Sequence, residues 1–150
     1  MKLNLGAGFR PQAGYINIDN RPEVEPDLLC DIEIGLPYDD DSIDEIRAVD
    51  FLEHVHQDKV IFVIEEIWRV LKDGGLFYSL TPSTAGIGAF MDFNHRSYWN
   101  LGSFLYFTDD AYRRLYGTKA KFQGEVRDTI IDHRLRNIIH TEATMYAVKS

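Results

Sequence analysis

The segment Lys2-Leu3-Asn4-Leu5-Gly6-Ala7-Gly8-Phe9-Arg10 decides the fold of this chain. Leu3 and Leu5 alternate with polar neighbours, which predicts a short strand with at least one buried face. Gly6 and Gly8 follow directly, and glycine lets the backbone turn at positive φ or approach a ligand closely. A strand that ends in such a turn is where an open α/β sheet binds a nucleotide-like ligand. An ordinary strand-to-loop turn explains these residues equally well, so the rest of the chain has to decide.

The composition is that of a soluble globular protein with one domain spanning residues 1–150. Hydrophobic residues make up 45% of the chain and charged residues 27%. No apolar stretch reaches membrane-spanning length, and Met1-Lys2 leads straight into the first predicted strand. We therefore expect no signal peptide, no membrane partner and a cytoplasmic location. The lone Cys30 excludes an internal disulfide and fits a reducing compartment.

The charge of the chain bears on its partners. A formal net charge of -8 argues against a broad nucleic-acid-binding surface, because affinity for nucleic acid comes largely from neutralising phosphates. A local basic patch escapes that argument. Basic residues concentrate late in the chain, at Arg113, Arg114, Lys119, Lys121, Arg127, Arg134 and Arg136.

Residues 15–19 predict a second strand, which ends on Asp19. A dinucleotide-binding fingerprint would need a third glycine where Pro11 stands, and a full helix before this strand. Their absence argues against a nicotinamide or flavin dehydrogenase. An acid that closes the second strand can accept hydrogen bonds from both hydroxyls of a ribose. The alternative for Asp19 is a turn aspartate ahead of Arg21-Pro22.

The remaining pattern predicts an α/β, Rossmann-like sheet with few helices. A helix is expected over 58–72, with Asp58 as its cap, Gly74 as its stop and a Glu65–Arg69 pair on its surface. A second helix is expected from 108 to Tyr116, whereas residues 83–94 have no helical period. Further strands are expected at 27–32, 43–50 and 75–81, and an antiparallel pair at 120–132 and 138–148 closes one side of the sheet.

The shortage of helices predicts that one face of the sheet is thinly covered. Short spacing at 9–14 and turn residues at 35–42 leave little room for the helices of a doubly wound fold. We expect the exposed apolar face to be buried by self-association, most simply in a twofold homodimer.

In order and spacing, these motifs resemble the class I S-adenosylmethionine-dependent methyltransferases, and within them the small methyltransferase type 11-like proteins. The resemblance covers residues 3–107. Asp73 and Phe93 stand where the family motifs have proline. The matching segments are Leu3–Gly8, Gly14–Asp19, Asp31-Ile32, Leu36–Tyr38 with Ser42–Asp44, Leu52–His54, Arg69–Gly75 and Asp92–Arg96.

The resemblance implies S-adenosylmethionine as the cofactor and S-adenosylhomocysteine as its product. It implies that the glycine motif passes under the methionine part of the cofactor and that Asp31-Ile32 contacts the adenine. Asn4 replaces an acid that is common in the family, and the helix that often precedes the first strand is absent. The cofactor-binding residues expected are Asn4, Gly6, Ala7, Gly8, Asp19, Asn20, Asp31, Ile32 and Asp50.

Methyl transfer from a sulfonium depends on positioning the nucleophile and excluding water. A general base helps if the acceptor is a hydroxyl or an amine, and His95 and Asp50 are the candidate catalytic residues. His95 has a structural loop histidine as its alternative, and Asp50 has binding of the cofactor's amino group. No ligand spacing supports zinc binding by His54, His56 and His95, so no metal site is predicted.

The expected function is methylation of an oxygen or nitrogen of a small-molecule or sugar-type acceptor. Two alternatives stay open. The first is a cofactor-binding, non-catalytic protein that regulates or completes a partner enzyme. The second is a nucleic-acid or protein methyltransferase that uses the late basic residues.

Overall fold

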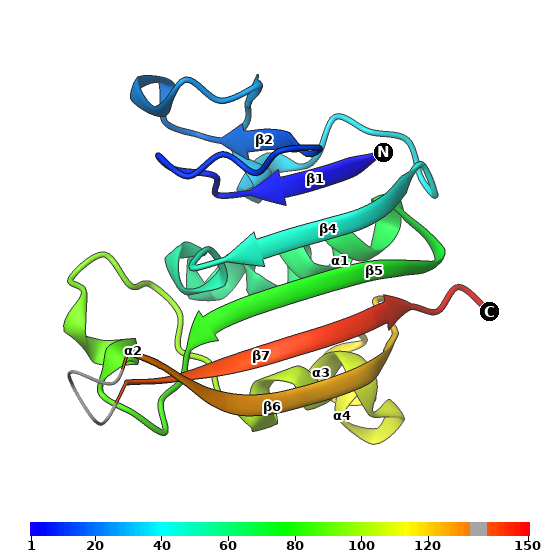
Figure 1. Ribbon diagram of the computed structural model, residues 1–150. Coiled ribbons are helices and arrows are strands. Elements are labelled where there is room, and N and C mark those ends of the chain that lie inside the picture. The colour runs from blue at the N-terminus through cyan, green and yellow to red at the C-terminus, as the bar shows by residue number, and fades with distance from the viewer. Residues whose placement is uncertain (133–137) are drawn as a thin grey trace.

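The protein forms a seven-stranded sheet in the order β3-β2-β1-β4-β5-β7-β6 (Figure 1). The computed structural model describes residues 1–132 and 138–150, so the predicted connection with Arg134 and Arg136 lies outside the described residues. β1 to β5 pair in parallel, and β7 is antiparallel to both β5 and β6. This confirms the predicted Rossmann-like sheet and its antiparallel pair. The strands are β1 (Lys2–Leu5), β2 (Ile16–Asp19), β3 (Leu28–Leu29), β4 (Ile43–Val49), β5 (Leu71–Pro82), β6 (Phe122–Asp132) and β7 (Ile138–Ala147).

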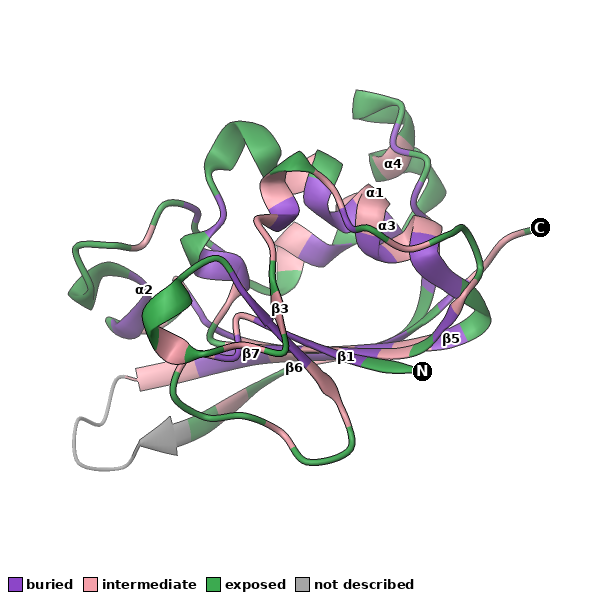
Figure 2. Cartoon of the chain, turned by 90° about the horizontal axis from the view of Figure 1, so that it is seen from above, coloured by how far each residue is buried: buried purple, intermediate pink, exposed green. Residues whose placement is uncertain are grey.

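The helices are few and short, as predicted. The α-helices are α1 (Val60–Val70), α2 (Gly88–Met91), α3 (Leu105–Thr108) and α4 (Asp110–Tyr116). The 3-10 turns are η1 (Pro22–Val24), η2 (Ile32–Ile34), η3 (Leu52–His54), η4 (Gln57–Lys59) and η5 (Leu101–Phe104). α1, α3 and α4 lie on one face of the sheet (Figure 2). Residues 6–42, all described, connect β1 to β2, β3 and β4 without an α-helix.

The core lies between the sheet and this helical layer. Leu3 and Leu5 of β1 and Phe77 of β5 are buried on the helical face. α1 buries residues at helical spacing against them, which are Val63, Ile64, Ile67 and Val70. None of the helices in the described part of the chain combines the length and apolar character that a membrane span requires.

The ends of α1 differ from the prediction. Asp58 lies inside η4, and the cap position is taken by Lys59, whose side chain makes no capping bond. The helix stops at Val70 because Leu71 is already extended and begins β5. Gly74 adopts φ 74° within β5 and is therefore not a helix stop.

Two further local predictions need correction. β3 is only Leu28–Leu29, because Asp31 accepts a hydrogen bond from the Glu33 N–H at 3.0 Å and caps η2 instead of extending the strand. Glu65 accepts from the Lys119 N–H, so the predicted Glu65–Arg69 pair does not form. The helix that ends at Gly117 forms as expected, with Asp109 capping its start.

The uncovered face of the sheet carries charged and hydrogen-bonded side chains beside its half-buried apolar residues, so it is not the exposed apolar face that we expected. Glu45 accepts from the Lys2 ammonium at 2.7 Å and from the Tyr15 hydroxyl. Glu142 accepts from the Tyr78 hydroxyl at 2.9 Å and from Arg127 Nε at 2.9 Å. Strand alternation places these groups on the side of the sheet opposite α1. The homodimer stays a prediction without this support.

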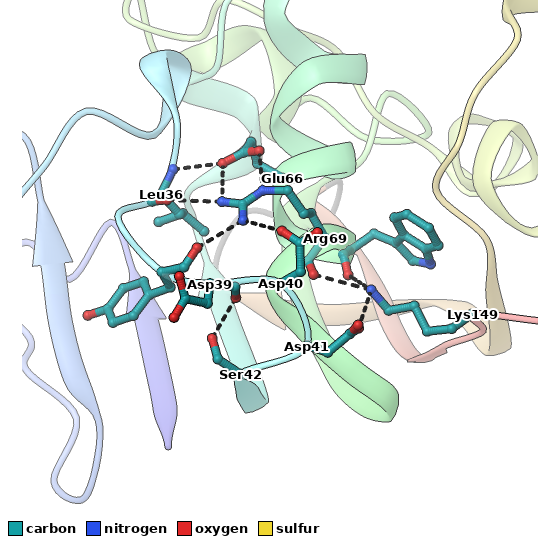
Figure 3. A network of polar contacts seen from close by, with 10 residues as sticks. Leu36, Asp39, Asp40, Asp41, Ser42, Glu66, Arg69 and Lys149 are labelled. Atoms are coloured by element: carbon teal, nitrogen blue, oxygen red, sulfur yellow. Dashed lines mark hydrogen bonds and ion pairs between the residues drawn. The ribbon is translucent and has the colours of Figure 1, made fainter.

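A polar cluster around Arg69 closes the end of the sheet where β4 and β5 begin (Figure 3). The guanidinium donates two hydrogen bonds to the Glu66 carboxylate, at 2.7 and 2.9 Å. It also donates to the carbonyls of Leu36 and Tyr38 and to Asp40 Oδ1, at 3.0, 2.9 and 2.7 Å. These bonds hold the pKa of Glu66 below its usual value. We call this group the Arg69 cluster.

Lys149 extends the Arg69 cluster from the C-terminal end of the chain. Its ammonium donates to the Trp68 carbonyl at 2.6 Å and pairs with Asp41 at 3.0 Å. The ammonium also lies 4.0 Å from the centre of the Trp68 ring, a distance at which a cation–π attraction is strong. Trp68 is half-buried, and its indole N–H donates to the Val148 carbonyl at 3.0 Å.

Candidate functional site

A cavity of about 560 Å³ lies at the carboxyl ends of β1, β2 and β4, where open α/β sheets bind ligands. The expected cofactor-binding residues that line it are Gly6, Asp19, Asn20, Asp31, Ile32 and Asp50. Asn4, Ala7, Gly8 and His95 do not line it. The other side is formed by residues that follow β4 and by the loop after α2, including Phe51, His54, His56, Asn94 and Arg96.

Asp19 ends β2 and is only 6% exposed, yet it reaches the cavity. Its Oδ2 accepts from the Gly8 N–H at 2.8 Å, and its Oδ1 accepts from the Arg21 N–H at 3.0 Å and from Arg21 Nε at 3.3 Å. A carboxylate has about four acceptor sites, so three bonds leave one for a ligand. Asp19 therefore holds the glycine turn and keeps an acceptor for the cavity.

The glycine turn has a steric reason at its first position. Gly6 adopts φ 63°, and a Cβ there would lie 2.5 Å from Phe51 Cδ2. The Phe51 ring thus packs onto the backbone of the turn, and any side chain at position 6 would displace it. Gly8 also has positive φ, 53°, but its role is to donate its N–H to Asp19. Ala7 is buried and donates its N–H to the Ile18 carbonyl at 3.0 Å.

Asn4 lies beneath the site rather than in it. It is buried and donates from Nδ2 to Asn17 Oδ1 at 3.0 Å. Asn17 in turn bonds the Gln12 N–H and Asp27, at 2.7 and 2.9 Å. This amide network braces the short crossover between β1 and β2. Among the described residues, the side-chain hydrogen bond of Asn4 goes to Asn17, and Asn4 does not line the cavity, so its expected contact with the cofactor stays a prediction.

Asp50 follows β4 in a left-handed conformation, with φ 50°. Its N–H donates to the Leu80 carbonyl at 2.9 Å, which anchors this conformation to β5. The exposed carboxylate lines the cavity, and Oδ1 lies 3.4 Å from Nε2 of the buried His140 on β7. Reasoning from sequence missed His140, which pairing of β7 with the end of β5 brings opposite Pro82.

His95 lies behind His54 rather than at the cavity surface. Its side chain is 7% exposed, and its ring centre is 5.1 Å from that of His54, which lines the cavity. His56 is separate, since its ring pairs with Glu33 at 2.8 Å. The expected convergence of His95 and Asp50 on one cavity surface is therefore not found. Asp50 and His54 line the cavity, whereas His95 does not.

Glu53, beside the cavity, is a second residue that reasoning from sequence overlooked. It lies between Leu52 and His54 in η3 and is 2% exposed. Burial raises the pKa of its carboxyl to about 7, although Thr81 Oγ1 donates to Oε2 at 2.7 Å and opposes that shift. The sequence did hold a signal for this residue, since Glu53 is an acid that follows the predicted strand and belongs to the Leu52–His54 motif of the family resemblance.

Comparisons with known proteins agree with this geometry. The family model described as "Methyltransferase domain" matches residues 12–79. No curated protein sequence matches the chain significantly. Many solved structures share the fold. An S-adenosylmethionine-dependent methyltransferase from Methanosarcina mazei has a TM-score of 0.69 at 14% identity, covering 99% of this chain and 92% of that one.

Two further structures are similar in fold. An S-adenosylmethionine-dependent methyltransferase from Archaeoglobus fulgidus has a TM-score of 0.67 at 12% identity, covering 97% of this chain and 85% of that one. A complex of the Haloferax volcanii Trm112 methyltransferase activator with a methyltransferase gives a TM-score of 0.67 at 19% identity, covering 99% and 82%. Residues 12–79 thus match the methyltransferase domain model, and the chain as a whole shares the fold of these S-adenosylmethionine-dependent methyltransferases.

Proposed function

We propose that the protein methylates an oxygen or nitrogen of a small-molecule acceptor, for which a sugar-type compound is the leading candidate. The observation that carries this proposal is a single cavity whose two sides are lined by different types of residue. Acids at the ends of β2 and β4 form one side, and His54, Asn94 and Arg96 form the other. Its volume of about 560 Å³ is in the range of small-ligand sites.

On the cofactor side, each wall residue has a role that fits its position. Asp19 keeps one acceptor for a ribose hydroxyl, and Asn20 lies next to it. Asp31 and the buried Ile32 would contact the adenine, and Asp50 the cofactor's amino group. When bound, S-adenosylmethionine supplies an electrophilic methyl group on a sulfonium. These residues would orient that group and keep water from it.

On the acceptor side, the geometry leaves two candidates for a base. His95 is the candidate from sequence. Its Nδ1 is bonded to the Ala89 carbonyl at 2.8 Å, so only Nε2 can accept a proton. Because His54 separates it from the cavity, His95 would need His54 to move or to relay the proton. Asp50 already faces the cavity and is the second candidate.

A small-molecule acceptor is favoured over nucleic acid because basic residues in the C-terminal part of the chain are already paired with acidic side chains. Arg113 and Lys121 both pair with Asp110, at 2.8 and 3.7 Å, and Arg127 pairs with Glu142 at 2.8 Å. Charges that are matched within the chain attract phosphates less. The net charge of -8 acts in the same direction.

A partner-dependent activity is the second candidate function. The Haloferax volcanii relative was solved together with the Trm112 activator. By analogy, this chain would bind the cofactor alone but transfer methyl groups only with a partner. The homodimer and the cytoplasmic location remain predictions from the sequence.

Calorimetric titration with S-adenosylhomocysteine tests the cofactor assignment. Asp19→Ala should weaken binding by about 1–3 kcal/mol, or roughly 5- to 150-fold, because it removes a charged acceptor. Asp39→Ala, an exposed acid at the other end of the sheet, is the matched control and should bind normally. Thermal unfolding of both variants reports whether the turn at Gly8 has loosened.

Two outcomes would contradict the assignment. Equal affinity in Asp19→Ala and wild type would remove the ribose role from Asp19. Absence of S-adenosylhomocysteine binding by the wild-type chain would remove the cofactor itself.

A further inference from the structure

Glu53, His54 and His95 come together beside the cavity from two separate segments. One ligand atom of each residue lies within 4.8 Å of the others. Glu53 and His54 belong to η3, and His95 belongs to the loop after α2. The loop is fixed to η3 because the Arg96 and Ser97 N–H groups donate to the Glu53 carbonyl, at 2.7 and 3.1 Å. We call these three residues the Glu53 cluster.

Both histidines are held in the orientation that metal ligands need. His54 Nδ1 lies 3.2 Å from the Asn94 carbonyl, and His95 Nδ1 lies 2.8 Å from the Ala89 carbonyl. A carbonyl oxygen only accepts, so each Nδ1 carries the proton in the neutral ring. Each Nε2 then has a free lone pair. Metal-binding histidines are usually oriented by such a bond from the other ring nitrogen.

Glu53 is a buried carboxyl that lacks a cation. Among the ion pairs of the described residues, none joins Glu53 to a lysine or arginine. Thr81 Oγ1 donates to Oε2 at 2.7 Å, and none of the side-chain donors in the described part of the chain bonds Oε1. Burying an ionised carboxylate without a partner is costly, and a bound cation would offset that cost.

We propose that Glu53, His54 and His95 bind a divalent transition-metal ion, with Zn²⁺ as the best fit. Two histidines and one carboxylate are the three-ligand set typical of catalytic metal sites, which keep an open position for water or substrate. Bonds of about 2.0–2.2 Å place tetrahedral ligand atoms roughly 3.4 Å apart, so ligand atoms separated by up to 4.8 Å have to move inward slightly.

The open position would face the cavity, because His54 lines it. If the proposed function holds, a hydroxyl acceptor bound there would lose its proton more easily. His95 would then act as a ligand and not as the general base. Metal binding itself does not depend on that function and is tested separately.

The test uses the whole 150-residue chain, treated with a chelator and then titrated with Co²⁺ and Zn²⁺. We expect one equivalent of Co²⁺ to give visible absorption bands and Zn²⁺ to displace it, with heat of binding that fits one site. His54→Ala, His95→Ala and Glu53→Gln should each weaken Zn²⁺ binding at least about 10-fold. His56→Ala should bind normally, because His56 pairs with Glu33 outside the cluster.

Two outcomes would overturn the proposal. The first is the absence of stoichiometric Co²⁺ or Zn²⁺ binding by the wild type. The second is equal Zn²⁺ binding by the wild type and all three cluster variants, each checked for folding by circular dichroism. S-adenosylhomocysteine affinity, measured on the same metal-free samples, keeps the two proposals apart. Normal cofactor binding without metal binding would sink only the metal site, and the reverse would sink only the methyltransferase assignment.

Discussion

The Arg69 cluster and the Glu53 cluster lie at opposite ends of the same sheet and differ in how their polar groups are paired. Arg69 precedes β5 and uses all five of its N–H donors, on Glu66, Asp40 and two backbone carbonyls. Glu53 follows β4 and is a buried carboxyl, to which Thr81 donates the one side-chain hydrogen bond found among the described residues. Both clusters are polar, but only in the Arg69 cluster does the central side chain use its full hydrogen-bonding capacity.

This difference separates stabilising polar groups from functional ones. A saturated network favours the folded state, because breaking it would leave charges and carbonyls unpaired. A buried acid with raised pKa disfavours the folded state and is typical of a site that binds a ligand. The two clusters should therefore respond in opposite directions when they are neutralised.

The largest effect is expected from Arg69→Met. Removing the guanidinium leaves the Leu36 and Tyr38 carbonyls without their Arg69 donor, and of the described bonds to Glu66 it leaves the one from the Leu36 N–H. We expect a loss of about 2–4 kcal/mol in the free energy of unfolding. For a chain of this size that lowers the melting temperature by roughly 5–15 °C. Differential scanning calorimetry measures it, with S-adenosylhomocysteine affinity unchanged.

Arg114→Met is the matched control for that experiment, since Arg114 is exposed on α4. It should change the free energy of unfolding by less than about 0.5 kcal/mol. If Arg69→Met melted within 2 °C of the control, on the scale of about 2–4 °C per kcal/mol, the Arg69 cluster would not stabilise the fold.

Glu53→Gln is expected to change the free energy of unfolding in the opposite direction, so that the variant is more stable than the wild type at high pH. The pKa of Glu53 is raised from 4.5 to about 7, so between these values the folded state binds more protons than the unfolded state. The free energy of unfolding of the wild type should then fall as pH rises through this window, by roughly 3 kcal/mol in total. Glutamine resembles the protonated acid and should escape the loss.

Urea unfolding at pH 4 and pH 8, in a metal-chelating buffer, tests this sign. Wild type and Glu53→Gln should be similar at pH 4, and the variant should be more stable at pH 8. A variant less stable than wild type at pH 8 would mean that the ionised Glu53 is stabilised in the fold, and the contrast between the clusters would fail.

The smallest effect is expected from Lys149→Met. Methionine keeps an apolar side chain over Trp68 but loses the bonds to the Trp68 carbonyl and Asp41. We expect a loss of about 1 kcal/mol, or about 2–4 °C in melting temperature. Lys119→Met, an exposed lysine, serves as the control. If Lys149→Met and Lys119→Met had the same melting temperature, Lys149 would not contribute to the stability that the Arg69 cluster provides.

Much of the fold was predictable because its signals are local. Alternation in β1, β2 and β4 and the apolar stripe of α1 are readable within a few residues. The errors arose where two local preferences compete. Asp31 ends β3 early because it caps η2, and α1 stops at Val70 because β5 starts at once.

By itself, the sequence determined the glycine turn at Gly6 and the acid that closes β2, since turn geometry and strand periodicity depend on neighbouring residues. Only the tertiary structure decided which polar groups meet. Glu53 and His95 are 42 positions apart and Asp50 and His140 are 90 apart, by the difference of their numbers. Such contacts depend on how the strands are ordered and how the loops pack, which no short stretch of sequence encodes. The chemistry of the site rests on those contacts.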